Sequence, residues 1–132
     1  MRTMAAFANT QGGYLIFGIH DSTQELIGLH DWTHSEFKNL DNAELANLLR
    51  DQFNRDIRWE RKLFTYDEMD FGVIYVFELT NKPVISRKDY GILKRSNIYY
   101  RYNGVSTIIE PGDLEDIIEK EKHRLVSELL NK

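Results

Sequence analysis

The sequence contains no cysteine, only two prolines and no long apolar run. The absence of cysteine excludes a disulfide framework and thiolate chemistry, and it agrees with a cytoplasmic protein. A transmembrane helix needs roughly 20 consecutive apolar residues, and no stretch approaches that length. The first residues also lack the basic-then-apolar pattern of a secretion signal. We therefore expect a cytoplasmic protein that has no membrane partner.

The chain also lacks an overall excess of positive charge. Its 132 residues carry 17 Lys and Arg against 21 Asp and Glu, for a net charge of −4. A protein that coats nucleic acid indiscriminately should be basic overall, and this one is not. The charge is uneven, however, because residues 1–49 carry −4, residues 50–109 carry +3 and residues 110–132 carry −3. The uneven charge is therefore compatible with a local basic face on an otherwise acidic protein.

Periodicity and capping signals predict helices mixed with short strands. Asp41 is placed to cap a helix, and the apolar stretch at 71–79 is typical of a central strand. The expected helices cover residues 1–9, 42–54 and 113–130, and the expected strands cover residues 14–19, 26–29, 57–66, 71–79 and 98–102. We predict one α+β domain over residues 1–132, with a mixed, mostly antiparallel sheet of about five strands and helices packed against it.

The stretch from Ala5 to Asp21 combines a helix end, a glycine turn and a buried strand. We expect Asn9 to stop the helix and Gly12 and Gly13 to form a tight reversal, because Asn and Gly tolerate left-handed backbone. Gly18 leaves room in the strand for another backbone or a ligand. The glycine pair could instead present N–H groups to a phosphate. A tight turn is favoured, because the pair follows a helix C-terminus and lacks the Gly-Lys-Ser/Thr ending of a P-loop.

Asp21 follows the buried strand, at a position where catalytic and metal-binding carboxylates are common. The alternative is a turn residue whose side chain bonds the backbone of Ser22 and Thr23. His30 and His34 lie four residues apart, but a zinc site needs three or four ligands and nothing else in the sequence converges on them. We interpret both histidines as surface residues, and we predict no metal site and no cofactor.

The strongest surface signal is a basic, tyrosine-rich stretch between residues 82 and 102. It holds six bases against one acid, Asp89, and it includes residues 84–96, the least regular part of the chain. Bases neutralise phosphates and exposed tyrosines offer stacking faces, a combination expected for nucleic-acid contact. The alternative is a solvated loop followed by an ordinary edge strand. The candidate phosphate contacts are Lys82, Arg87, Lys88, Lys94, Arg95 and Arg101, and the candidate stacking rings are Tyr90, Tyr99, Tyr100 and Tyr102.

The expected C-terminal helix at 113–130 carries an interrupted apolar stripe. Glu121 and Lys122 break the stripe, so we expect this helix to lie on the domain surface or at a partner interface. A second copy of the chain is a candidate partner, which would make the protein a homo-oligomer. The stripe consists of Leu114, Ile117, Ile118, Leu125 and Leu129.

Three motifs of the sequence resemble landmarks of the Schlafen AlbA_2 family. The first, at residues 6–21, reads Ala-Phe-Ala-Asn-Thr-Gln-Gly-Gly-Tyr-Leu-Ile-Phe-Gly-Ile-His-Asp and is followed by Ile27-Gly28-Leu29. The others, in the family's order, are Lys82-Pro83-Val84 and Tyr99-Tyr100-Arg101-Tyr102-Asn103-Gly104. The resemblance implies an α+β fold and a role in binding DNA or RNA. In bacteria it implies a frequent place in transcriptional regulators or defence proteins.

In the Schlafen branch, the resemblance also implies a metal-dependent ribonuclease that uses two glutamates and an aspartate. The aspartate corresponds to Asp21. The glutamates belong to a Glu-x-x-x-x-Glu-x-Lys element upstream of the first motif, and the chain begins at Met1, too late to contain it. We therefore expect an N-terminally short domain. A lone carboxylate cannot hold the hard cation that such chemistry needs.

The resulting hypothesis is a nucleic-acid-binding module for DNA or RNA within a transcriptional regulator or defence protein. It predicts a binder rather than an enzyme. One alternative is a metal-dependent endoribonuclease, with Asp21 catalytic and the other carboxylates outside this chain. The other alternative is a protein-interaction or sensor domain, which the net charge of −4 and the interrupted helix favour.

Overall fold

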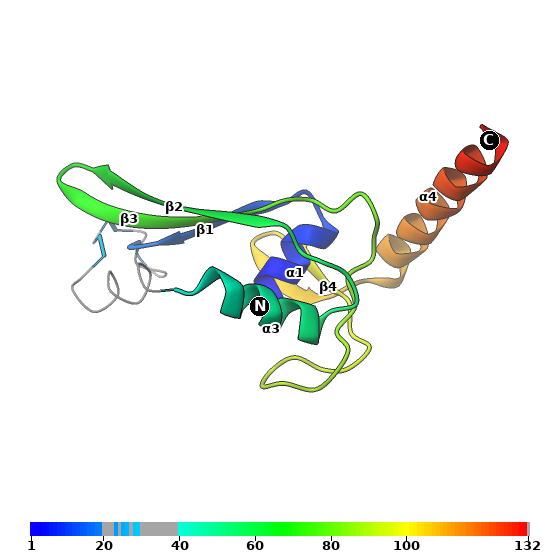
Figure 1. Ribbon diagram of the computed structural model, residues 1–132, viewed down its shortest axis with the longest axis horizontal. Coiled ribbons are helices and arrows are strands. Elements are labelled where there is room, and N and C mark those ends of the chain that lie inside the picture. Colours follow the sequence, from blue (N-terminus) through cyan, green and yellow to red (C-terminus); the bar gives the residue numbers. More distant parts are fainter. Residues whose placement is uncertain (20–22, 24, 27, 30–39, 132) are drawn as a thin grey trace.

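The computed structural model describes residues 1–19, 23, 25–26, 28–29 and 40–131. Within these ranges the chain forms three helices and five strands, which confirms the predicted α+β class (Figure 1). In chain order the elements are α1 (Arg2–Asn9), β1 (Gly13–Phe17), α3 (Asn42–Gln52), β2 (Trp59–Tyr66), β3 (Met69–Val76), β4 (Tyr99–Tyr102), β5 (Val105–Ile108) and α4 (Pro111–Leu130).

Strands β1, β3 and β2 form an antiparallel sheet with β3 in the centre. Tyr75 of β3 faces Tyr14 of β1 on one side and Glu60 of β2 on the other. The central position was predicted from the apolar character of this strand and is confirmed, because β3 pairs with β1 along one edge and with β2 along the other. In Figure 1, α1 and α3 both lie on the same side of this sheet.

Strands β4 and β5 form a separate two-stranded sheet, so the prediction of one sheet is wrong. The strand β5 was not predicted, and the predicted strand at 26–29 is reduced in the described residues to a bridge between Ile19 and Leu26. The signal for β5 was present in the turn that precedes it. Asn103 and Gly104 both take positive φ, 46° and 81°, as a two-residue hairpin turn requires.

The helix α1 lies at the centre of the core. It packs against β4, β5 and β3, so it joins the two sheets. Its alanines let the strands approach the helix closely, and the residues from Met4 to Asn9 are all buried. Because its neighbours cover α1 on several sides, tertiary packing stabilises a helix of eight residues that would be marginal alone.

The turn after α1 needs glycine at two successive positions. Gly12 holds the left-handed position, with φ of 74°, and its N–H donates to the carbonyl oxygen of Phe7 at 2.8 Å. A Cβ added to Gly12 would lie 2.6 Å from the carbonyl oxygen of Val76, and one added to Gly13 would lie 2.7 Å from the Phe7 ring. The predicted tight turn is therefore what these glycines form.

We expect Gly13→Ala to lower the free energy of unfolding by about 1–3 kcal/mol, the usual cost of overpacking a core. The added methyl group would force the buried Phe7 ring out of its place. Urea unfolding of the two proteins measures the difference. Gly112→Ala is the matched control, because a Cβ there meets nothing within 4 Å. Equal stability of Gly13→Ala and the wild type would contradict the packing described here.

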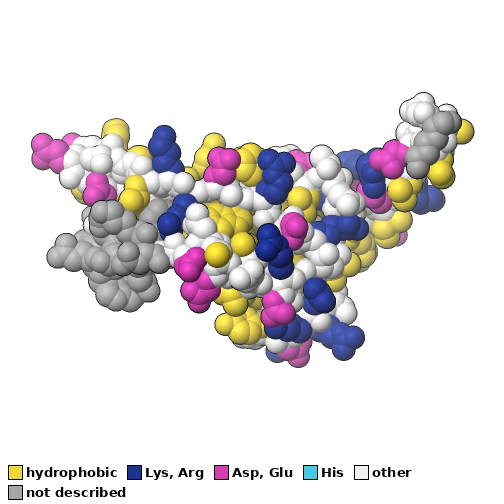
Figure 2. All heavy atoms as spheres, viewed as in Figure 1, with side chains coloured by type: hydrophobic (Ala, Val, Ile, Leu, Met, Phe, Trp, Pro, Cys, Tyr) yellow, Lys and Arg dark blue, Asp and Glu magenta, His cyan; other side chains and the backbone are white. Residues whose placement is uncertain are grey.

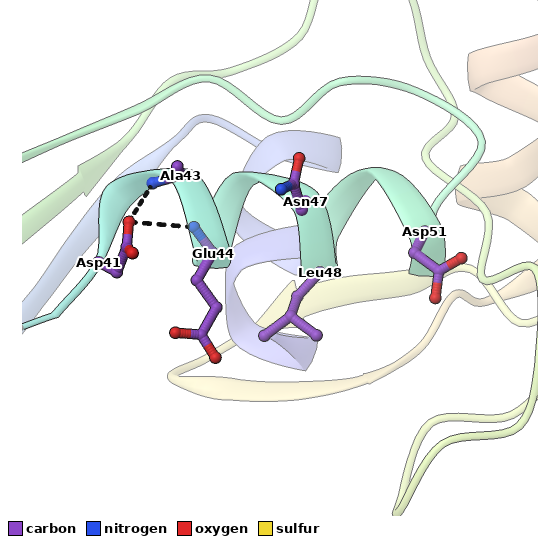
Figure 3. A pocket seen from close by; sticks show the side chains of 6 residues that line it. All are labelled: Asp41, Ala43, Glu44, Asn47, Leu48 and Asp51. Atoms are coloured by element: carbon purple, nitrogen blue, oxygen red, sulfur yellow. Dashed lines mark hydrogen bonds between the residues drawn. The ribbon is translucent and has the colours of Figure 1, made fainter.

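The helix α3 begins as predicted, with Asp41 as its N-cap. One carboxylate oxygen of Asp41 accepts from the backbone N–H groups of Ala43 at 2.9 Å and Glu44 at 3.3 Å (Figure 3). The burial along this helix does not follow side-chain polarity, because Leu48 is exposed whereas the polar Gln52 is fully buried. That buried amide positions the candidate site described next.

Candidate nucleic-acid interface

The basic stretch of the sequence forms a loop, residues 84–98, between the two sheets. Its first anchor is Asn9 at the end of α1, whose side chain is fully buried. The Asn9 amide donates to the carbonyl oxygens of Val84 at 3.1 Å and Tyr99 at 2.9 Å. Its oxygen accepts from the N–H of Val84 at 2.7 Å. One side chain therefore closes both ends of the loop.

The second anchor is Gln52 at the end of α3. Its amide nitrogen donates to the Ser86 hydroxyl and to the carbonyl oxygen of Lys88, both at 2.7 Å. Its carbonyl oxygen on the backbone accepts from the N–H of Arg87 at 2.7 Å. The stretch expected to be least regular is thus fixed by buried polar side chains from two helices.

The end of the loop is a tight turn at Tyr90–Leu93. The backbones of Tyr90 and Leu93 exchange two hydrogen bonds of 2.9 Å around Gly91, whose φ is 59°. Leu93 is buried beneath the turn, and the N–H of Lys94 donates to the Tyr99 hydroxyl at 2.9 Å. These contacts hold the turn from inside and leave its outer side chains in solvent.

Four of the six candidate phosphate contacts lie exposed on this loop: Arg87, Lys88, Lys94 and Arg95. We call the part of the loop that carries them, residues 87–95, the basic tip. Lys88 forms an ion pair with Asp51 of α3, and Arg87 donates to the carbonyl oxygen of Arg50 at 3.4 Å. Figure 2 shows lysine and arginine side chains gathered where this loop protrudes below α3 in Figure 1, with a few acidic side chains between them. The tip is therefore a small basic surface on an acidic protein.

The other two candidate bases hold the fold together instead of standing free. Lys82 donates to the carbonyl oxygen of Thr10 at 3.0 Å and pairs with Glu78 at 3.0 Å. Arg101 donates to the Ser106 hydroxyl at 2.7 Å, and its guanidinium lies 5.2 Å from the centre of the Phe7 ring. Each base thus has one partner nearby in the sequence and one far from it, Thr10 for Lys82 and Phe7 for Arg101, and the local sequence does not reveal the distant one.

The tyrosines divide in the same way. Tyr99 is buried in the core, whereas Tyr90 is 55% exposed at the turn of the basic tip. The Tyr102 hydroxyl donates to Asp113 of α4 and accepts from the N–H of Glu110 at 2.9 Å. Burial and the Asp113 hydrogen bond raise the pKa of Tyr102 to about 12. Burial, followed by nearby carboxylates, also raises the pKa of Tyr100.

Of the turn residues predicted as structural, Gly18 takes φ of 109° and lies against another backbone. A Cβ added there would meet the Phe71 ring at 2.8 Å and Gly28 at 3.1 Å. The space beside Gly18 is therefore filled by protein.

Asp21, His30 and His34 lie outside the described residues. Within the part of the chain that is described, no three His, Cys, Asp or Glu side chains are grouped to hold a metal ion. The acidic side chains Asp41, Glu44 and Asp51 line a shallow hollow on the outer side of α3, but they are spread along the helix and do not point toward one another (Figure 3).

The helix α4 presents much of its apolar stripe to solvent. Ile117 is buried against the domain, but the helix then projects away from the body (Figure 1). Arg124 pairs with Glu121 and Glu128 along the helix. No helix among the described residues is long and apolar enough to cross a membrane. The exposed large apolar side chains of α4 are Ile118, Leu125, Val126, Leu129 and Leu130.

Comparison with known proteins gives three findings. The chain matches the family model described as Schlafen, AlbA_2 over residues 1–110. It is 36% identical over 132 residues to the Uncharacterized ATP-binding protein UU034 of Ureaplasma parvum serovar 3 (strain ATCC 700970), covering 89% of this chain and 36% of that protein. Among solved structures, the DIP2311 protein from Corynebacterium diphtheriae has a TM-score of 0.54 at 19% identity, covering 86% of this chain and 17% of that chain. At that identity the structural similarity concerns the fold alone.

Proposed function

Because the chain belongs to the Schlafen AlbA_2 family, we propose that it is a nucleic-acid-binding module that contacts phosphates through its basic tip. The observation that carries the proposal is four exposed bases on one loop whose backbone is fixed by Asn9 and Gln52. A fixed loop places its charges before contact, so binding costs little ordering entropy. We infer further that the module works within a transcriptional regulator or defence protein.

The net charge of −4 shapes how such a module would bind. At long range the acidic body repels a polyanion, so the interaction depends on a few local phosphate contacts. Each phosphate neutralised on duplex DNA contributes about 0.9 to the slope of log affinity against log salt concentration. We therefore expect binding that is detectable at low salt and has a modest slope of about 3–4.

Replacing Arg87, Lys94 and Arg95 together with alanine is expected to remove most of this affinity. Loss of three phosphate contacts should lower the salt slope by about 2–3. Fluorescence anisotropy with labelled duplex DNA, single-stranded DNA and RNA measures both quantities. The matched control removes three other exposed bases, Lys62, Lys120 and Lys122, and so makes the same change in net charge. Equal losses in the two triple variants would contradict a role for the tip, as would a wild type that binds nothing at low salt.

A second candidate function is adenine-nucleotide binding, which the name of the Ureaplasma relative, an ATP-binding protein, favours. The glycine turn offers little support for it. The Gly12 N–H is engaged by the Phe7 carbonyl oxygen at the C-terminus of α1, where the helix dipole disfavours anions. Titration calorimetry with ATP tests the candidate directly, and saturable binding would favour it over the basic tip as the main function.

The third candidate is the metal-dependent endoribonuclease that the family resemblance implies for Asp21. Incubation of RNA with Mn²⁺ or Mg²⁺ tests it, with Asp21→Asn as the control. Cleavage by the wild type and not by the variant would establish the activity, whereas equal cleavage by both proteins would exclude Asp21 from it.

We also propose that the exposed stripe of α4 binds a second copy of the chain in antiparallel orientation. In the register that sets Ile118 opposite Leu125, the acidic first half of one helix would lie against Lys122 and Arg124 of the other. Light scattering should give a dimer for the wild type and a monomer for the double variant Leu125→Glu and Leu129→Glu. Ser127→Glu on the same helix serves as the control. A monomeric wild type at high concentration would contradict this proposal.

A further inference from the structure

Two large apolar side chains are exposed on the turn at residues 90–93, which we call the crest of the basic tip. Tyr90 is 55% exposed and Ile92 is 66% exposed, whereas Leu93 between the tip and the core is 3% exposed. The crest is thus apolar in its centre, with Arg87 and Lys88 before it in sequence and Lys94 and Arg95 after it. The lysines and arginines can therefore bind phosphates while Tyr90 and Ile92 contact an apolar surface of the same partner.

The backbone of the crest is fixed by hydrogen bonds before any partner binds. Two backbone hydrogen bonds close the turn between Tyr90 and Leu93. On the shoulder of the turn, the Asp89 carboxylate accepts from the N–H of Arg95 at 2.8 Å. Since Asn9 and Gln52 fix the base of the loop, insertion of the crest would not have to order a flexible segment first.

The number and kind of exposed rings decide which nucleic acid fits this tip. A platform for a single strand stacks successive bases on several aromatic faces. Here Tyr99 is buried, and Tyr100 and Tyr102 are half-buried with their ring centres 5.1 Å apart. Tyr90 is therefore the one exposed ring of the four candidates in this stretch. A single ring beside an aliphatic side chain instead suits a wedge between neighbouring base pairs, the role that apolar side chains take in minor-groove binders.

We propose that the basic tip inserts Tyr90 and Ile92 as an apolar wedge into the minor groove of double-stranded DNA and kinks the duplex. The lysines and arginines that flank the crest contact the phosphates on the two sides of the groove. Kinking costs least at flexible pyrimidine–purine steps, so the tip prefers duplexes with a central TA step. This proposal rests on the proposed nucleic-acid-binding function, and it names the partner and the mode of contact.

The test compares three proteins on a short duplex that has a central TA step and a fluorophore at each end. These are the wild type, the double variant Tyr90→Ser and Ile92→Ser, and the variant in which alanine replaces Arg87, Lys94 and Arg95. Energy transfer between the fluorophores reports the kink, and anisotropy over a salt series reports affinity and salt slope. Thermal unfolding confirms that the double variant is folded, which is expected because both side chains are exposed.

We expect the wild type to increase energy transfer, by a kink of about 20–90°. The double variant should bind about tenfold more weakly with an unchanged salt slope and should leave the duplex straight. Binding without a kink, or an equal kink by the double variant, would overturn the wedge and leave the nucleic-acid-binding function standing. Tighter binding to single-stranded DNA or to RNA than to the duplex would overturn it too. Absence of binding to every nucleic acid would overturn both proposals.

Discussion

Replacing Asn9 with leucine is expected to lower the free energy of unfolding by at least about 3 kcal/mol, a large share of the roughly 5–15 kcal/mol that holds a domain of this size together. Leucine has a similar volume, so the expected loss comes from hydrogen bonding. The change leaves three buried backbone groups without partners: the N–H and carbonyl of Val84 and the carbonyl of Tyr99. Each orphaned buried group costs about 1–3 kcal/mol.

Asn54→Leu is the matched control for this measurement. Asn54 bonds the same loop in a similar way, donating to the carbonyl oxygen of Pro83 at 3.4 Å and accepting from the N–H of Ile85 at 2.6 Å. It is exposed, so water can replace the lost partners and the cost should stay near 1 kcal/mol or below. Urea unfolding of the three proteins gives the comparison. Equal losses for Asn9→Leu and Asn54→Leu would show that burial of the Asn9 amide is not what stabilises the loop.

Replacing Gln52 with leucine is expected to weaken DNA binding about tenfold, although it removes no charge from the basic tip. Without the Gln52 amide, the Ser86 hydroxyl and the Lys88 carbonyl lose their anchor. The loop then has to be ordered when DNA binds, and fixing the backbone of one residue costs about 1–2 kcal/mol, which corresponds to roughly a tenfold loss of affinity.

Anisotropy at one salt concentration, together with urea unfolding, separates this effect from simple loss of folding. We expect Gln52→Leu to be destabilised by about 2–4 kcal/mol and yet to remain folded at the temperature of the binding assay. Asn47→Ala on the exposed side of the same helix is the control, and it should leave the affinity unchanged and should not destabilise the protein. Unaltered affinity in a folded Gln52→Leu protein would show that rigidity of the loop is not needed for binding.

Local signals in the sequence predicted the parts of the fold that depend on neighbouring residues. The Asp41 cap, the end of α1 before the glycine turn and the central strand β3 all follow from patterns a few residues long. The division into two sheets did not follow, because it depends on which strands pair over long distances in the chain. The strand β5 could have been predicted, since Asn103-Gly104 is a strong hairpin signal.

The sequence predicted which stretch of the chain forms the candidate site, but it did not predict which distant residues hold that stretch in place. Composition alone located the basic loop, whereas its anchors Asn9 and Gln52 lie 75 and 34 residues away from Val84 and Ser86. Long-range contacts also explain why Lys82 and Arg101 were placed among the phosphate contacts, because Lys82 binds the Thr10 carbonyl and Arg101 lies over the Phe7 ring. A base reads the same in the sequence whether its partner is a phosphate or a distant part of its own chain.

The most direct test of the central claim is the change in backbone amide chemical shifts when a short DNA duplex is added to the isotope-labelled protein. If the basic tip is the contact surface, shifts should concentrate at residues 86–96 and decline as salt is raised. The amides of α4 and of the strand β2 should change little. Shifts concentrated on α4 or on β2, with residues 86–96 unchanged, would contradict the account.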